Sequence, residues 1–168
     1  NSSQVSNVNG VKSKVVDVLN TFSTSNINKF GGRFKYSKLG QIIDGSDSSI
    51  TSNITRVIIR RNMKCLLNQS AQYELCYGNT FKKNVGGFNI KSTGFTLANQ
   101  SGTLYFTDVP DATGDMGVLS VVKESSQSNE FTVVVKSAGT IDYKKGEIIV
   151  NTVNITSTVV ENDIIEIQ

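Results

Sequence analysis

The stretch of sequence that decides the fold is Gly139-Thr-Ile-Asp-Tyr-Lys-Lys-Gly-Glu-Ile-Ile-Val150. Apolar residues alternate with polar ones on both sides of Lys144-Lys145-Gly146. An apolar period of two is typical of a strand with one buried face, and a glycine at the turn supplies the positive φ that a tight hairpin needs. The stretch therefore predicts a short antiparallel β-hairpin.

The composition extends this prediction to most of the 168 residues. Val, Ile and Thr together supply 49 residues, whereas Ala and Leu supply only 12. Side chains branched at Cβ pack well on a pleated sheet, whereas Ala and Leu favour helices. From Asn53 onward the apolar period is close to two, so residues 53–168 are predicted to form a β-rich domain of eight to ten short strands.

The same alternation places the individual strands. Ile54–Leu67 is predicted to be the first long strand, with Ala71–Tyr77 returning as its partner. Further strands are predicted at Phe88–Leu97, Thr103–Thr107, Val118–Lys123, Glu130–Lys136, Val153–Ile155 and Ile164–Ile167. The only proline, Pro110, falls in a predicted loop over Asp108–Gly117.

Residues 1–52 read as a helical lead-in with two short helices. In the first, predicted over Val11–Phe22, apolar residues recur at helical spacing, namely Val11, Val15, Val18, Leu19 and Phe22. Ser23–Asn28 is expected to end it. The second is predicted over Ser37–Ile43, with Ser37 as its N-cap and Gly45 as its stop.

The expected fold class is therefore α+β, a helical lead-in followed by a predominantly antiparallel sheet or sandwich. The chain begins at Asn1 without an initiating methionine and ends in strand-like alternation. We expect it to be a fragment of a longer chain.

Catalytic function is not expected. The chain has no histidine, so the Ser-His-Asp and Cys-His schemes lack their base. No cofactor motif is present, since the glycine pairs at Gly31 and Gly86 lack the Lys-Ser/Thr of a phosphate loop. Neither a cofactor nor a small-molecule substrate is expected.

One acidic cluster is a candidate metal site. Asp108, Asp111 and Asp115 share the predicted proline loop, and their oxygen atoms could ligate Ca²⁺. The spacing does not match an EF-hand, and acidic residues are common in solvated loops. The favoured interpretation is a loop without metal.

The two cysteines, Cys65 and Cys76, would lie near each other if their segments paired as a hairpin around residues 69–71. The favoured interpretation is two buried thiols, because so sparse a pair is no disulfide scaffold. Nearby, Arg56, Arg60, Arg61 and Lys64 form the densest basic run. This run is typical of an edge strand whose charges discourage wrong strand pairing, or of residues that form ion pairs with a partner subunit.

Neither nucleic acid nor a membrane is expected as a partner. The net charge of +3 is too small to argue for nucleic acid. No run approaches the roughly 18 apolar residues of a membrane-spanning helix, so no membrane is expected.

Two patches of the sequence resemble one protein family. The first joins Phe34-Lys-Tyr-Ser-Lys-Leu39, Ile43-Asp44 and Ile50-Thr-Ser-Asn-Ile-Thr55, and the second is the hairpin 139–151. Together they resemble the C-terminal region of the baseplate wedge protein of large contractile-tailed bacteriophages. The likeness runs from about residue 11 to about residue 160, with weaker matching over 79–130.

The resemblance implies a structural protein of the virion's tail baseplate, assembled in the host bacterial cytoplasm. Such wedge proteins form dimers, join into a ring around the tail hub and hold other wedge proteins. The candidate contact residues on this reading are Val11, Val15, Leu19, Phe22, Leu39, Ile43, Arg56 and Arg60. Leu39 and Ile43 are alternatively plain core.

A second hypothesis is a host-surface or carbohydrate-binding β-module of a phage tail or surface protein. Ser, Thr and Asn together supply 52 residues, which is compatible with such a surface. Tryptophan, the usual aromatic platform of sugar sites, is absent.

Overall fold

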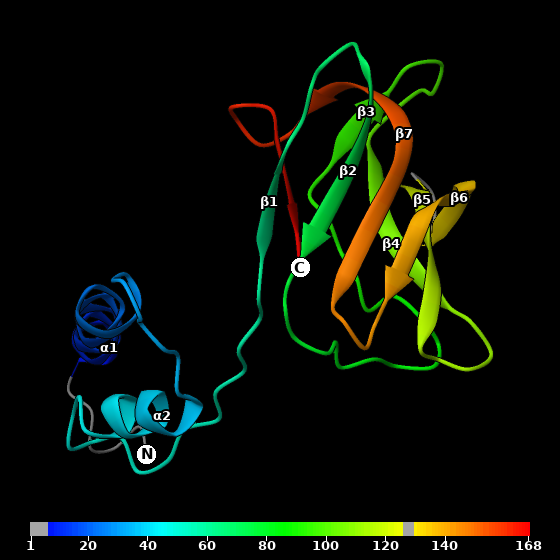
Figure 1. The fold of residues 1–168 in the computed structure, drawn as a ribbon. Helices are drawn as coiled ribbons and strands as arrows, with labels where there is room; N and C mark the ends of the chain where they lie inside the picture. Colours follow the sequence, from blue (N-terminus) through cyan, green and yellow to red (C-terminus); the bar gives the residue numbers. More distant parts are fainter. Residues whose placement is uncertain (1–6, 126–129) are drawn as a thin grey trace. The chain divides into compact units, whose positions relative to one another are not determined.

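The computed structural model describes residues 7–125 and 130–168. Residues 1–6, at the start of the predicted lead-in, and residues 126–129, between the predicted strands Val118–Lys123 and Glu130–Lys136, lie outside the described residues. The chain divides into two units, residues 1–57 and residues 58–168 (Figure 1). The first holds the helices and the second holds the strands, which confirms the expected α+β class.

The first helix, α1, spans Val8–Phe22 and confirms the predicted amphipathic segment. Asn7 caps it, since its side-chain oxygen accepts a hydrogen bond from the backbone N–H of Gly10 at 3.0 Å. The prediction that Ser23–Asn28 ends the helix is wrong at its start, because Ser23–Ile27 continues as a π-helix, η1. The side chains of Thr24 and Asn26 donate hydrogen bonds to the carbonyls of Asn20 and Phe22 in the preceding turn, which keeps the backbone coiled.

The second helix, α2, spans Tyr36–Asp44. The predicted stop at Gly45 is confirmed as the C-cap, but Ser37 is not the N-cap. Lys35 takes that position with extended backbone and no side-chain cap, so the helix begins one residue before Ser37.

The β-rich unit contains eight antiparallel strands within the described residues, as predicted in type and number. They are β1 Arg61–Lys64, β2 Ser70–Cys76, β3 Phe95–Leu97, β4 Leu104–Pro110, β5 Met116–Glu124, β6 Phe131–Asp142, β7 Glu147–Thr158 and β8 Ile164–Ile167. Strands β3 to β7 form a closed small barrel, because β7 pairs with both β3 and β6. Strand β2 adds to the other side of β7 (Figure 1).

The hairpin that decided the fold is confirmed as β6 and β7. Ile141 lies opposite Ile148, and both are fully buried. Gly146 closes the turn with φ +70°, as predicted, and its Cα lies against the carbonyl oxygen of Asn79, so that an added Cβ would overlap this oxygen.

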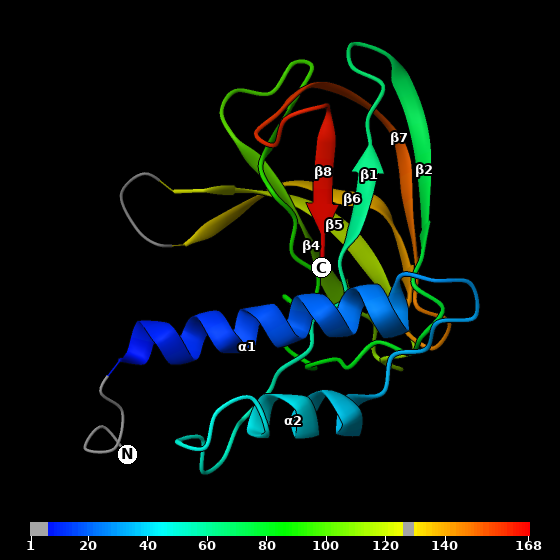
Figure 2. The same ribbon diagram turned by 90° about the vertical axis from the view of Figure 1, so that its left-hand side faces the viewer.

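The predicted pairing of the first two strands is wrong. Ile54–Leu67 is not one long strand, since only β1 within it is extended in a ladder. Strand β1 pairs with β8, and β2 pairs with β7, so the two do not form a hairpin (Figure 2). Alternation identifies a strand but not its partner, because the partner is chosen by contacts distant in sequence.

Two further boundaries differ from the prediction. Within Phe88–Leu97 only β3 is regular strand, although Lys91 and Gln168 exchange two backbone hydrogen bonds of 2.9 Å. The loop predicted from Asp108 begins only at Asp111, because β4 continues through Pro110. Proline can stand at a strand end, where its missing N–H is not needed.

The core of the β-rich unit fills the barrel with large apolar side chains. Fully buried members include Phe95, Leu104, Leu119, Ile141, Ile148, Val150, Ile155, Ile165 and Ile167. Phe95 stacks on Phe106, with 4.4 Å between the ring centroids. Each such side chain contributes about 1.5–3 kcal/mol to stability, so this unit has a substantial core of its own.

Candidate interaction surface

Helix α1 uses its apolar stripe against the rest of the two-helix unit. The sequence-predicted contact residues of this unit are Phe22 and Leu39, which are buried, and Val11, Val15, Leu19 and Ile43, which are half-buried. Lys38 places its ammonium 6.0 Å from the centre of the Phe22 ring. The structure therefore brings these residues together, but it leaves only part of their surface open to a partner.

Other apolar side chains of the same unit are exposed, and the sequence reasoning missed them. They are Val8, Val16, Phe30, Phe34, Tyr36, Ile54 and Val57. Val16 is the apolar residue between Val11 and Phe22 that falls off the predicted stripe, and this position could have indicated its exposure. Phe30 is fully exposed beside Gly31, whose φ of +72° turns the chain between the helices. An exposed apolar surface of this kind is typical of a site that contacts another protein.

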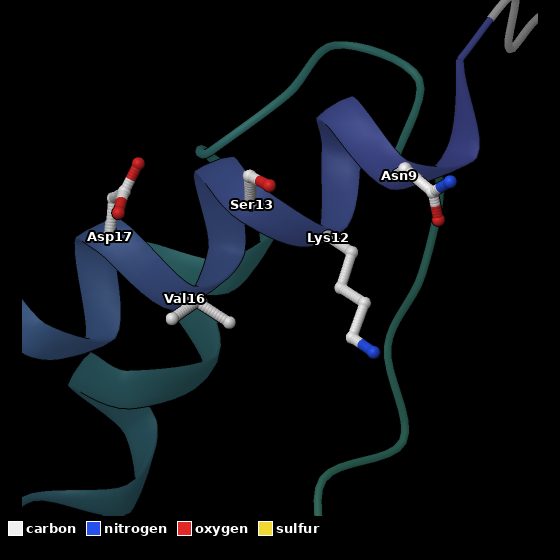
Figure 3. Close-up of a pocket in the computed structure, with 5 residues that line it drawn as sticks. All are labelled: Asn9, Lys12, Ser13, Val16 and Asp17. Atoms are coloured by element: carbon white, nitrogen blue, oxygen red, sulfur yellow. The ribbon is translucent and has the colours of Figure 1, made fainter.

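One face of α1 is hollowed. Its lining residues are Asn9, Lys12, Ser13, Val16 and Asp17, which stand on successive turns of the helix (Figure 3). The hollow has a volume of about 360 Å³ and is wide open. It combines one apolar side chain with one cation and one anion, which suits a polypeptide surface rather than an enclosed small molecule.

An ion pair ties the first helix to the turn after the second. Lys14 Nζ lies 2.7 Å from Asp47 Oδ2, and the hydroxyl of Ser49 also donates to the Asp47 carboxylate at 2.7 Å. The hydrogen bond from Lys14, followed by those from Ser49, lowers the pKa of Asp47 well below its usual range. The carboxylate therefore stays charged at neutral pH.

The two arginine candidates lie in different settings. Arg56 is exposed in the first unit, outside any strand. Arg60 is exposed just before β1, and its guanidinium lies 2.8 Å from Glu166 Oε1 of β8. The prediction that both project from one strand is wrong, since neither is in a strand.

The acidic candidates do not form a common cluster. Asp108 is fully buried in β4, whereas Asp111 and Asp115 lie in the loop between β4 and β5. Across residues 7–125 and 130–168 no group of three His, Cys, Asp or Glu side chains gathers as a metal site would require. The loop aspartates are instead held by protein groups.

Asp108 accepts three hydrogen bonds inside the barrel. Its carboxylate oxygens accept from Tyr143 Oη at 2.6 Å, from Asn89 Nδ2 at 2.7 Å and from the backbone N–H of Ile90 at 2.7 Å. Burial, and then the bond to Asp108, raise the pKa of Tyr143 above its usual value. The carboxylate thus fastens the segment before β3 and the β6–β7 turn to β4.

The loop aspartates are paired at the surface. Asp115 contacts Lys144 at 2.7 Å and Lys83 at 3.6 Å, and the bond from Lys144 is the main reason that its pKa is lowered. Asp111 accepts from the hydroxyl of Thr113 and the N–H of Gly114, both at 2.7 Å. These contacts order the loop without calling for a cation.

The cysteines are both free thiols. Cys65 is buried and Cys76 is exposed, so the prediction of two buried thiols holds for Cys65 alone. Burial raises the pKa of Cys65 to about 11, which makes it a poor nucleophile at neutral pH.

None of the described helices is both long and apolar enough to span a bilayer.

The comparison with protein families points to the helical unit. Residues 1–62 match the family model of baseplate structural protein gp6, C-terminal domain III. The resemblance to the C-terminal region of a baseplate wedge protein is thereby confirmed for this part of the chain. The match covers both helices and ends within β1. No curated protein matches the chain.

Proposed function

We propose, because residues 1–62 match a baseplate structural protein family, that the chain is a structural part of a phage tail baseplate. It works by docking on other baseplate wedge proteins and on copies of itself. It is not an enzyme, and it is assembled in the host bacterial cytoplasm before it takes its place in the virion. The family match supports the baseplate role, and the surface of the two-helix unit supports docking.

The observation that carries the docking part of the proposal is the small core of the two-helix unit. Only Phe22 and Leu39 are buried among the described apolar residues up to Val57. Val8 remains 70% exposed and Val16 46% exposed on α1. Helices of this length draw most of their stability from tertiary packing, so a unit with so little packing of its own gains stability from a partner that covers it.

The hollowed face of α1 suits a second copy of the helix. Lys12 and Asp17 stand about one and a half turns apart, with Ser13 and Val16 between them (Figure 3). A copy of α1 that packs parallel on this face brings each Lys12 beside the copy's Asp17, because the two side chains leave the face on opposite sides. Small Ser13 at the crossing lets the two backbones approach closely.

The test is complex formation with the other wedge proteins of the same phage. The chain is co-expressed with them, and the purified complex is sized by light scattering. The wild-type chain is expected to elute in a complex. Val16→Glu is expected to weaken that complex at least about tenfold, because the new charge is buried against the partner.

Thr21→Glu is the matched control, because Thr21 is also exposed on α1 but lies off the hollowed face. It should leave the complex unchanged. A chain that stays alone and monomeric with every wedge protein contradicts the proposal, as does a Val16→Glu chain that assembles like the wild type.

A further inference from the structure

Strand β6 has one unpartnered edge. Over Phe131–Ala138 it pairs only with β5, because its ladder with β7 covers Gly139–Asp142. In the described part of the chain no strand lies on the other side of this half. The yellow ends of β5 and β6 project from the rest of the barrel (Figure 2).

The hydrogen-bonding groups of this edge have a definite direction. The backbone N–H of Ser125 donates to the carbonyl of Glu130 at 2.9 Å, and Lys123 lies opposite Thr132 two residues further along. Hydrogen-bonded and non-hydrogen-bonded pairs alternate in an antiparallel ladder. Phe131 and Val133 therefore point their N–H and C=O groups away from β5.

The side chains along this edge carry no charge from Phe131 to Val135. Phe131 and Val133 are each 47% exposed. The Phe131 ring lies 6.3 Å from that of Tyr105 and 6.5 Å from that of Phe88, so the edge borders an aromatic surface. Natural edge strands are usually guarded by lysine, proline or a covering segment.

We propose that this edge of β6 pairs, antiparallel and in register, with the same edge of a second copy of the chain. The pairing goes beyond the proposed function, which assigns docking to the two-helix unit. The two outward-pointing residues stand symmetrically about Thr132, so a two-fold axis at Thr132 joins Phe131 to the partner's Val133 and Val133 to the partner's Phe131. Every outward N–H then faces a carbonyl of opposite partial charge.

A second copy fits this edge better than an unrelated strand. The register gives two aromatic–β-branched cross-strand pairs on one face and a Thr132–Thr132 pair on the other, and both kinds of pair are favourable. No charged side chain meets a like charge between Phe131 and Val133. The edge is thus complementary to itself.

The test is a charge swap at the two-fold axis in the full chain. Thr132 is exposed, and its own N–H is used by β5, so its substitution leaves the barrel intact. Thr132→Lys and Thr132→Glu are each expected to raise the dimer dissociation constant at least about tenfold, because like charges then lie directly opposite. Mixing the two variants should restore dimers, since lysine then faces glutamate.

Thr140→Lys is the matched control. Thr140 is an exposed threonine of the same strand, but both of its sides are paired, with Val118 of β5 and Ile149 of β7. Sedimentation velocity over a concentration series measures all four proteins. A wild-type chain that remains monomeric, a Thr132→Lys chain that dimerises like the wild type, or a mixture that stays monomeric overturns the pairing.

A disulfide test separates this contact from docking through α1. Thr132→Cys is made with Cys76→Ser, so that the exposed native thiol is removed. The two new cysteines would lie about 4.5 Å apart at Cα, within the range of a disulfide. Mild oxidation should yield a covalent dimer from Thr132→Cys and none from Thr140→Cys. A Val16→Glu chain still forms this dimer if only the helical docking fails.

Discussion

Asp108 is the single residue on which the interior of the β-rich unit depends most. Its carboxylate serves Tyr143, Asn89 and the backbone of Ile90, all from segments distant in sequence. Removing an acceptor leaves buried donors without partners, which costs about 1–3 kcal/mol for each. The residue acts as a polar junction inside an apolar barrel.

Asp108→Ala is therefore expected to lower the free energy of unfolding by at least about 3 kcal/mol. Urea unfolding followed by tyrosine fluorescence measures the change. Asp111→Ala is the control, because Asp111 is exposed and its loss should cost less than about 1 kcal/mol. Equal losses for the two variants would contradict the role given to Asp108.

Two buried side chains predict the response of the β-rich unit to alkali. Burial raises the pKa of Cys65 to about 11 and that of Tyr77 to about 12, and the Tyr77 hydroxyl donates to the carbonyl of Ile167 at 2.8 Å. The ordinary values of these groups are 9.0 and 10.0, so the unfolded chain loses these protons first. Ionisation therefore favours the unfolded state.

The free energy of unfolding should be constant between about pH 5 and pH 9 and should fall as the pH rises from 9 to 12. Urea midpoints at pH 7, 9 and 10.5 measure this. Cys65→Ala should reduce the fall, because one of the two ionising groups is gone. A midpoint that is as high at pH 10.5 as at pH 7 would refute the prediction.

At the scale of elements, two glycines predict opposite effects of alanine. Gly146 holds the β6–β7 turn at φ +70° against the Asn79 carbonyl, so Gly146→Ala should cost at least about 1 kcal/mol. Gly40 lies inside α2 with no atom within 4 Å of an added Cβ. Gly40→Ala should therefore stabilise that helix by about 0.5–1 kcal/mol.

Circular dichroism separates the two responses, because Gly40→Ala raises the helical signal and Gly146→Ala lowers the unfolding midpoint of the strands. The reverse order of effects would contradict the conformations described for these two positions. Each variant also serves as the control for the other, since the substitution is the same.

Local elements were the most predictable part of the fold. The β6–β7 hairpin and helix α1 are specified by patterns within about a dozen residues, and both are confirmed. Strand β1 was predicted to pair with Ala71–Tyr77, but it pairs with β8, whose residues lie about a hundred positions later. Period-two alternation tells which face is buried and leaves the neighbour open.

The candidate site was predicted less well, for a related reason. The stripe from Val11 to Phe22 predicts a contact surface, but the stripe packs largely within the two-helix unit. The exposed Val16 and Phe34 carry no periodic signal of their own. Asp108 was assigned to a loop because Pro110 is near, although β4 ends with that proline in the ladder.

At the scale of the molecule, the two units differ in self-sufficiency. Residues 58–168 contain the filled barrel, whereas residues 1–57 bury only Phe22 and Leu39 among their described apolar side chains. The barrel's closure through β7 was not expected from the sequence, since an antiparallel sheet or a sandwich fits the same strands. Closure depends on one long strand with partners on both sides.

A fragment of residues 58–168 should therefore fold alone, with a cooperative unfolding transition. A fragment of residues 1–57 should show little stable helix by itself, because its packing is too small to offset the cost of ordering the chain. Circular dichroism and urea titration of both fragments measure this. A cooperatively folded helical fragment would contradict the argument that the unit needs a partner.

The pairing of β1 with β8 also determines when the chain can fold. During translation, β1 leaves the ribosome long before its partner Ile164–Ile167 has been synthesised, and β2 likewise waits for β7. Ile165 and Ile167 are fully buried, so the interior stays incomplete until they emerge. Nascent strands must be kept soluble over that interval, and a chain that stops before Ile164 would be prone to aggregation.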